Sequence, residues 1–167
     1  YGTAAQDRLG YLDVIEPTLE KVAEQTGEVV WFIAEECGRA IYLLEKEGSN
    51  AARTTGATGK QAPLHATAAG KAILSGQPDE RIDELTLIEY TDATITDQEV
   101  LREEITQVLE TGVAYNDNEK LAGLRAVACP IRVEERIIGA ISVGGPAERI
   151  RNSDFEKELP DLLRGVA

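Results

Sequence analysis

The sequence predicts an α+β fold in which helices flank one mostly antiparallel sheet. The hydrophobic patterns run in the order helix, strands, helices, strands, helix, unlike the regular alternation of a parallel α/β protein. Strands that follow one another are joined by tight turns, which favours antiparallel pairing. A chain of 167 residues is ample for one hydrophobic core, and we expect residues 1–167 to form one domain.

The N-terminal third is expected to form a helix followed by a β-hairpin. The helix should run from a capping box at Thr3–Gln6 to a stop at Gly27. Its inward face, at helical spacing, comprises Leu9, Leu12, Ile15, Leu19 and Val22. Residues 28–34 and 40–44 are rich in β-branched and aromatic side chains, and the connection between them contains Gly38, so they are predicted to pair as strands.

The middle third is expected to hold one short strand and three helices. The strand should lie near residues 52–55 in a polar segment. A helix rich in small residues should cover residues 65–74, and a second, opened by a proline, should cover residues 78–85. A third is predicted between a capping box at Thr96–Glu99 and a stop at Gly112. Its apolar face comprises Leu101, Ile105, Val108 and Leu109.

The last third is expected to form three strands and a closing helix. The strands should cover residues 113–117, 124–133 and 136–144, with Glu134-Glu135 as the turn between the last two. A capping box at Ser153–Glu156 predicts where the helix begins. The side chains expected to face inward are Phe155, Leu159, Leu162 and Val166.

Charge excludes one class of function. Seventeen Lys and Arg against thirty Asp and Glu leave a net charge of −13, so this domain alone should repel the phosphates of nucleic acids. Only six of the cations are Lys. Acid excess with scarce Lys is typical of halophilic proteins from a high-salt cytoplasm, and an ordinary acidic cytosolic protein is an equally good interpretation.

The chain is expected to act in the cytoplasm without membrane contact. Its longest apolar run, Val29–Ala34, is far shorter than the roughly 20 residues that cross a bilayer. No signal peptide is recognisable, and Cys37 and Cys129 are expected to stay reduced. The absence of Met and a beginning inside a predicted helix suggest a piece of a longer protein.

The sequence carries no signature of catalysis or of cofactor binding. The Gly-Lys pairs at 59–60 and 70–71 lack the upstream glycine and the following hydroxyl of a phosphate-binding loop. The single histidine, His65, is expected to pack and to bond a backbone group, and one His cannot complete a zinc set. Asp117 and Glu119 stand out among the carboxylates because they follow a strand and precede a glycine. We expect no enzyme, no metal and no cofactor.

Small side chains gather on one helix and two strands. They are Ala66, Ala68, Ala69 and Gly70 on the helix, Ala126 and Ala128 on strand 124–133, and Ala140, Ser142 and Gly144 on strand 136–144. Such faces either pack very closely, the alternative that we favour, or leave a cavity. An odd-length connection at Glu134-Glu135 would bring the two strand faces together, whereas a two-residue turn would not.

If a cavity exists, its polar groups favour an anion. The first amides of the helix near His65 lack intrahelical partners and carry the positive end of the helix dipole. A carboxylate there needs no Lys or Arg, and Asn116 and Ser142 could add hydrogen bonds. The expected partner is therefore a small organic acid.

At this point several motifs resemble the effector-binding domain of IclR-type transcriptional regulators. They are the segment Pro63–Ala72, residues 91–96 ahead of a helix, Glu119 with Gly123-Leu124-Arg125, and residues 140–146, and the resemblance covers essentially the whole chain. It implies a GAF-like fold and a ligand sensor. It also implies homodimers or homotetramers, and DNA binding only through an N-terminal winged helix-turn-helix that is absent from this fragment.

The resemblance also implies binding positions. In members that take short keto acids, the ligand meets two backbone amides that match Ala68 and Ala69. The other matching positions are Asn116, Ala126, Ser142 and Gly144, with apolar walls at Thr54, Ala62 and Leu124. This sequence has Asn116, Ala126 and Gly144 where those members have Asp, Cys and Ser, so a roomier, less acidic pocket and a larger, aromatic acid are expected. The alternatives are a stand-alone GAF-like enzyme or cofactor module, and an interaction domain without a ligand.

Overall fold

The structure of the chain, a computed structural model, describes residues 2–36, 38–49 and 58–166. Its elements in chain order are α1 (Gly2–Thr26), β1 (Val29–Glu36), β2 (Arg39–Lys46), β3 (Gln61–Ala62), α2 (Ala68–Leu74), α3 (Glu80–Asp83), α4 (Gln98–Thr111), β4 (Ala114–Asp117), β5 (Leu124–Val133), β6 (Arg136–Pro146), the π-helical turn η1 (Asp154–Glu158) and α5 (Leu159–Val166). The strand predicted near residues 52–55 lies outside the described residues.

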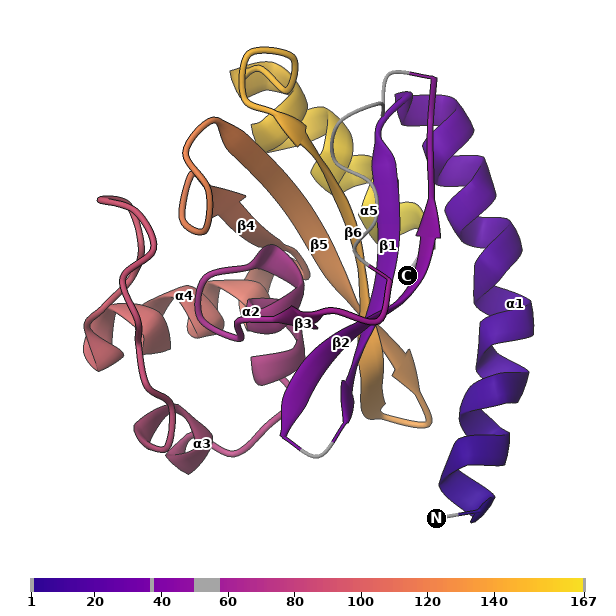
Figure 1. Cartoon of the computed structure of the whole chain (residues 1–167), viewed down its shortest axis with the longest axis horizontal. Coiled ribbons are helices and arrows are strands. Elements are labelled where there is room, and N and C mark those ends of the chain that lie inside the picture. Colours follow the sequence, from indigo (N-terminus) through magenta and orange to yellow (C-terminus); the bar gives the residue numbers. More distant parts are fainter. Residues whose placement is uncertain (1, 37, 50–57, 167) are drawn as a thin grey trace.

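One six-stranded sheet forms the centre of the molecule. Its order is β3-β2-β1-β6-β5-β4, and each neighbouring pair is antiparallel. Helices α1 and α5 cover one face, and α2, α3 and α4 lie on the other (Figure 1). This arrangement confirms the predicted α+β class with a single antiparallel sheet.

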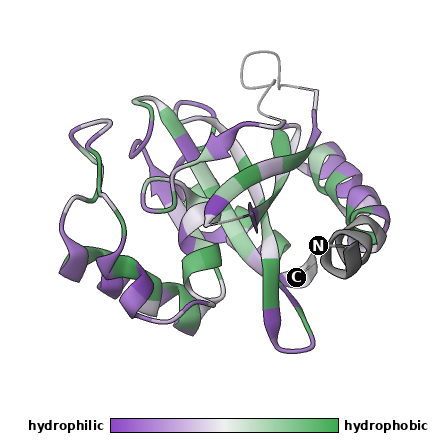
Figure 2. Cartoon of the chain, turned by 60° about the horizontal axis from the view of Figure 1, so that its bottom comes forward, coloured by the Kyte–Doolittle hydropathy of each residue, from purple (hydrophilic) through white to green (hydrophobic). Residues whose placement is uncertain are grey.

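Two hydrophobic cores follow from this layering, one on each side of the sheet. Figure 2 shows mainly apolar strands and helices that alternate between polar and apolar residues, as expected for elements that bury one side. The core under α1 and α5 holds the larger side chains, including Leu19, Phe32, Ile141 and Leu163. The core under α2 holds many small ones, including Ala68, Ala72, Ala128 and Ala140.

A β-bulge decides the register of β5 and β6. The turn between them has two residues, Glu134 and Glu135, both with positive φ (51° and 68°). That turn alone would have separated the two small-residue faces. The pairing shifts between Ile131 and Arg132, however, so that Ala128 lies opposite Ser142 and Ala126 opposite Gly144. Because the bulge adds one residue to β6, the small faces meet on one side of the sheet despite the two-residue turn.

Three predicted helix caps are wrong. Thr3 lies within α1 and not before it. Asp97, not Thr96, caps α4, because its Oδ1 accepts the N–H groups of Glu99 and Val100. Ser153 makes no capping hydrogen bond, and its backbone is already helical. The predicted helix end at Gly112 is confirmed, with a left-handed φ of 80° that glycine adopts without strain.

The predicted helix faces are confirmed where the side chains are described, with two corrections, and the side chains of Leu9 and Val166 lie outside that part. In α4, Leu101, Ile105 and Val108 are buried, but Leu109 is 57% exposed. In the last helix Leu163 is fully buried and Leu162 only partly. The reason for the second shift is the π-helical turn η1, which uses more residues per turn and rotates the following face by about one position.

The remaining predicted elements have shorter bounds than expected. The helix predicted over residues 65–74 begins at Ala68, and the one predicted over 78–85 covers only α3. In the part of the chain that the structure describes, no helix combines the length and apolar character that a bilayer crossing requires.

Candidate functional site

A cavity of about 810 Å³ opens between α2 and the small-residue face of the sheet. Its floor comes from β4, β5 and β6, where Asn116 lies opposite Ala126 and Ala126 lies opposite Gly144. Residues directly opposite one another in an antiparallel sheet share a face, so the three positions form one continuous surface. The cavity exists because alanine, serine and glycine leave the space above this surface unfilled.

Helix α2 supplies the second wall. Thr67 is its N-cap, and the Thr67 hydroxyl accepts the N–H of Gly70 at 3.0 Å. Ala68 and Ala69 follow at the first two helical positions and line the cavity. Their amides have no intrahelical partner and meet no acceptor among the described residues. Two N–H donors are therefore free at the cavity.

Two aromatic residues that sequence reasoning missed form a third wall. Trp31 on β1 and Tyr42 on β2 both line the cavity, with ring centroids 5.8 Å apart in an edge-to-face arrangement. The Trp31 indole N–H donates to Glu45 Oε1 at 2.7 Å. A Cβ added at Gly144 would lie 2.8 Å from the Trp31 ring, so the indole occupies space that only glycine leaves open. The alternation of β1 separates Trp31 from Phe32, but only the pairing of Trp31 with Ser142 brings it to this floor.

The loop after β4 forms one edge of the cavity, and hydrogen bonds from neighbouring residues hold it in place. Thr91 Oγ1 donates to the Asn118 carbonyl at 2.6 Å, and Thr94 Oγ1 donates to the Glu119 carbonyl. Asn116 Oδ1 accepts the N–H of Glu119 at 2.9 Å. The next residues of the loop line the opening, so these bonds fix the cavity edge from the turn preceding α4.

A buried ion pair lies beneath the same loop. Lys71 on α2 is fully buried, and its ammonium lies 2.6 Å from the Glu119 carboxylate and 3.2 Å from that of Glu104. It also donates to the Tyr115 carbonyl at 2.8 Å. Burial raises the pKa of the Glu119 carboxyl, an effect that Lys71 opposes. These contacts join α2, α4, β4 and the loop into one unit.

Two other residues singled out from the sequence have structural partners. Asp117 accepts a hydrogen bond from Arg125 Nε at 2.9 Å, and this contact lowers the pKa of the Asp117 carboxyl. His65 is buried, and its Nε2 donates to the Ile88 carbonyl at 2.8 Å while the ring lies beside Tyr90. The prediction that His65 packs and bonds a backbone group is confirmed.

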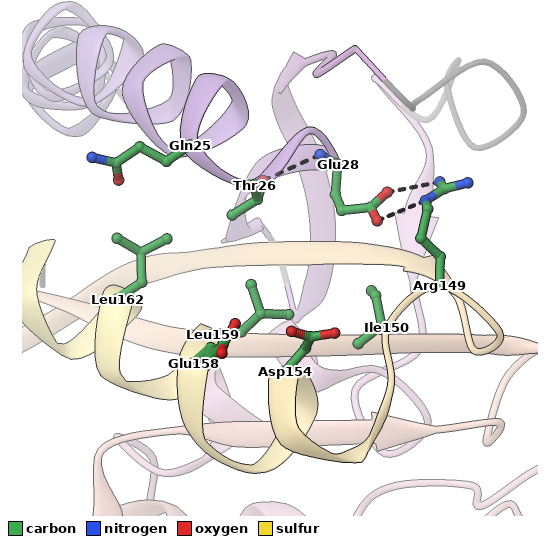
Figure 3. Close-up of a pocket in the computed structure, with 9 residues that line it drawn as sticks. All are labelled: Gln25, Thr26, Glu28, Arg149, Ile150, Asp154, Glu158, Leu159 and Leu162. Atoms are coloured by element: carbon green, nitrogen blue, oxygen red, sulfur yellow. Dashed lines mark hydrogen bonds and ion pairs between the residues drawn. The ribbon is translucent and has the colours of Figure 1, made fainter.

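A smaller cavity of about 250 Å³ lies between the end of α1 and η1–α5 (Figure 3). Glu28 and Arg149 form a two-point ion pair at its edge, at 2.7 and 2.8 Å. On the opposite side, a hydrogen bond to Asp154 raises the pKa of the Glu158 carboxyl. Since its polar groups bond one another, this cavity offers fewer free donors than the larger one.

The structure brings most of the predicted site residues together. Those that line the larger cavity are Ala68, Ala69, Asn116, Leu124, Ala126, Ser142 and Gly144. Ala62 is buried on β3 opposite Ala40 and does not line it, and Thr54 lies outside the described residues. Among the residues that the structure describes, no cluster of His, Cys, Asp or Glu could hold a metal ion. Burial raises the pKa of the Cys129 thiol to about 12, so this thiol is not an activated nucleophile.

Comparison with known proteins identifies the family. The model of the bacterial transcriptional regulator IclR C-terminal domain matches residues 3–167. The chain is 34% identical over 157 residues to the probable HTH-type transcriptional regulator ArcR of Halobacterium salinarum, covering 89% of this chain and 60% of ArcR. The chain thus spans well under two thirds of that relative's length.

Solved structures share the fold over nearly the whole chain. The IclR structure from Thermotoga maritima superimposes with a TM-score of 0.88 at 26% identity, covering 99% of this chain and 68% of that one. An IclR homologue from Microbacterium hydrocarbonoxydans, complexed with 4-hydroxybenzoate, gives 0.82 at 23% identity, covering 94% and 65%. With the family match, these findings show that the chain belongs to the IclR family of bacterial transcriptional regulators, as its C-terminal domain, and not to a family of enzymes.

Proposed function

We propose that this chain is the effector-sensing domain of a cytoplasmic regulator and that its larger cavity binds a small organic acid. The observation that carries the proposal is a cavity of about 810 Å³ bounded by small side chains and by the two free amides of Ala68 and Ala69. Occupancy of the cavity would then alter how the whole protein binds DNA. It would also alter how the whole protein assembles as a homodimer or homotetramer. With a net charge of −13, this chain is poorly suited to hold DNA, so we assign DNA binding to a winged helix-turn-helix domain outside these residues.

The polar groups of the cavity suit a carboxylate. Two adjacent N–H groups at the beginning of α2 can donate to its oxygens, and the positive end of the helix dipole favours the negative charge. Asn116 uses its Oδ1 for the N–H of Glu119, which leaves its Nδ2 to donate to a ligand. Ser142 is buried at the floor, and its hydroxyl provides a further donor. Together these donors would replace the water that a carboxylate loses on entering.

The rest of the cavity suits an aromatic ring. Trp31 and Tyr42 present aromatic surface beside Leu124 and Ala126, and its volume lies within the usual range for small-molecule sites. Gly144 lets this aromatic wall approach the floor, because the Trp31 ring lies where a larger side chain would be. Since a structure of the same fold was solved with 4-hydroxybenzoate, phenolic and benzoic acids are the first probes to test.

A thermal-shift screen against metabolite acids, followed by calorimetry, tests the proposal. An acid present at one hundred times its dissociation constant should add about 2.7 kcal/mol to the stability of the folded chain. Ala68→Asp should abolish binding, because it puts a carboxylate beside the amides. Ala93→Asp, which adds the same charge at an exposed loop position, should leave binding unchanged.

A milder substitution covers the case in which Ala68→Asp does not fold. Ser142→Ala removes one donor with little change in volume and should weaken binding by about 1 kcal/mol, or about fivefold. The proposal fails if no acid stabilises the wild-type chain. The placement of the anion fails if a folded Ala68→Asp binds the acid as well as the wild type does.

A further inference from the structure

The lining of the larger cavity includes two exposed lysines that the sequence analysis did not single out. Lys60, just before β3, and Lys120, in the loop after β4, both line the cavity. They come from opposite ends of the sheet, so the fold brings them together at one place.

In the part of the chain that the structure describes, the charges of Lys60 and Lys120 are not paired with a carboxylate, although the chain is strongly acidic. There are thirty Asp and Glu residues against six lysines. Lys46 and Lys71 form ion pairs with carboxylates, yet neither Lys60 nor Lys120 has an ion pair among the described residues. The carboxylate nearest to Lys120 in sequence, Glu119, is buried against Lys71.

The pKa of Lys120 also indicates that its charge lacks a partner within the described ranges. Burial, and then repulsion from Lys60, lowers the pKa of the Lys120 ammonium. Two ammonium groups that repel each other at the edge of a cavity cost free energy in the empty state. An anion bound between them would relieve that repulsion.

The two polar ends of the cavity differ in place and in chemistry. The inner end offers uncharged donors, namely the Ala68 and Ala69 amides and the groups of Asn116 and Ser142, which we have assigned to one carboxylate. The outer end, where Lys60 and Lys120 are exposed to solvent, offers two positive charges. Apolar and aromatic surface from Trp31 and Leu124 also lines the cavity.

We infer that the effector is a dianion, a dicarboxylic acid whose second carboxylate binds between Lys60 and Lys120 while its first binds at the beginning of α2. This inference rests on the proposed function, because it assumes that the cavity binds an acid at its inner end. It narrows the class of effector from organic acids in general to acids with a carboxylate at each end of an apolar or aromatic body.

Calorimetry with matched pairs of acids tests the inference. Terephthalate is compared with 4-methylbenzoate, and adipate with hexanoate, so that within each pair only the second charge is added. The wild-type chain should bind the better of the two diacids about tenfold more tightly than its matched monoacid. Two partly exposed ion pairs would supply a gain of this size. The advantage should shrink as salt is added, because salt screens exposed charges.

Two double variants of equal net charge locate the effect. Lys60→Gln with Lys120→Gln should bring the diacid to within about twofold of the monoacid, because it should weaken the diacid much more than the monoacid. Lys21→Gln with Lys157→Gln removes the same charge from residues that do not line the cavity and should keep the preference.

The outcomes separate this inference from the proposal beneath it. If monoacids bind and diacids bind no better, or if the Lys60/Lys120 variant keeps the preference, the inference is overturned and the acid-sensing proposal stands. If the folded wild-type chain binds neither class of acid, both are overturned.

Discussion

Lys71 is fully buried beside the cavity, where it contacts two carboxylates and the Tyr115 carbonyl. A buried charge of this kind adds little net stability over an apolar residue, but removing one partner leaves the other uncompensated. Its position on α2, directly after the helical turn that we assign to the ligand, makes it part of the support of the site.

Replacing Lys71 tests this support. Lys71→Met should lower the free energy of unfolding by about 3–5 kcal/mol, because Glu119 would remain buried without its partner. Lys46→Met, which removes a partly exposed pair with Glu16 and Glu20, should cost about 1 kcal/mol or less. Urea unfolding measures both. Adding Glu119→Gln to Lys71→Met should recover part of the loss, and equal costs for the two single variants would contradict the account.

Glycines at two helical positions should respond in opposite directions to alanine. A Cβ at Gly70 would lie 2.5 Å from the Leu64 carbonyl oxygen and 2.6 Å from the Leu64 Cα, so the backbone would have to move. Gly70→Ala should therefore destabilise the chain by about 1–3 kcal/mol. At Gly10 nothing lies within 4 Å, and Gly10→Ala should stabilise α1 by up to about 1 kcal/mol. Thermal melts compare them, and a neutral Gly70→Ala would show that α2 does not lie this close to Leu64.

Sequence reasoning predicted the residues of the floor and those of the α2 wall, but it missed the aromatic wall and the lysines. Ala126, Ser142 and Gly144 were predictable because small residues at every second position of a strand share one face. Trp31 and Lys60 were not, because each reaches the cavity only through the strand order of the sheet. Strand order depends on contacts between segments far apart in sequence, which local patterns do not encode.

Among the elements, β6 has the largest consequence for the site. The two-residue turn at Glu134 and Glu135 is readable from the sequence, but the bulge that follows it is not. A bulge depends on how a strand fits both of its neighbours, here β1 and β5. The positions of β1, β2, β4, β5 and β6 were predicted well, because β-branched and aromatic runs mark most of them. In contrast, β3 was not predicted, and the register that creates the cavity was left open.

The beginning of α4 gives a test at the scale of an element. Thr96 and Asp97 are both suitable caps by residue type, but it is Asp97 that precedes the helix with an extended backbone and whose Oδ1 accepts the Glu99 N–H at 2.8 Å. Asp97→Ala should cost about 0.5–2 kcal/mol in thermal or urea unfolding, and Thr96→Ala only a few tenths. A larger loss for Thr96→Ala than for Asp97→Ala would show that Thr96 is the cap, as the sequence predicted.

Over the whole molecule, the two faces of the sheet carry side chains of different size, and this difference explains the architecture. Large side chains fill the core under α1 and α5, and small ones leave space under α2. The α+β class and the antiparallel sheet were predictable because element order and short turns restrict the topology. A stable core on one face permits a cavity on the other.

The net charge of −13 leads to a prediction about salt. If the surface is adapted to a high-salt cytoplasm, one of the two interpretations of its charge, the melting temperature should rise from dilute buffer to molar KCl, because salt screens repulsion among the carboxylates. Sucrose, which favours the compact state without screening charge, serves as the control. A melting temperature that falls as KCl increases would contradict this interpretation.

Trp31 is the single tryptophan of the chain, and it lines the larger cavity, so its fluorescence reports directly on occupancy. Titration with each acid that binds in calorimetry, excited at the red edge of indole absorption, should change the emission saturably and with the same dissociation constant. Trp31→Phe should remove that signal. Calorimetric binding with unchanged Trp31 emission would put the acid elsewhere, for instance in the smaller cavity beside α5, and would contradict the proposal that this cavity is the sensor.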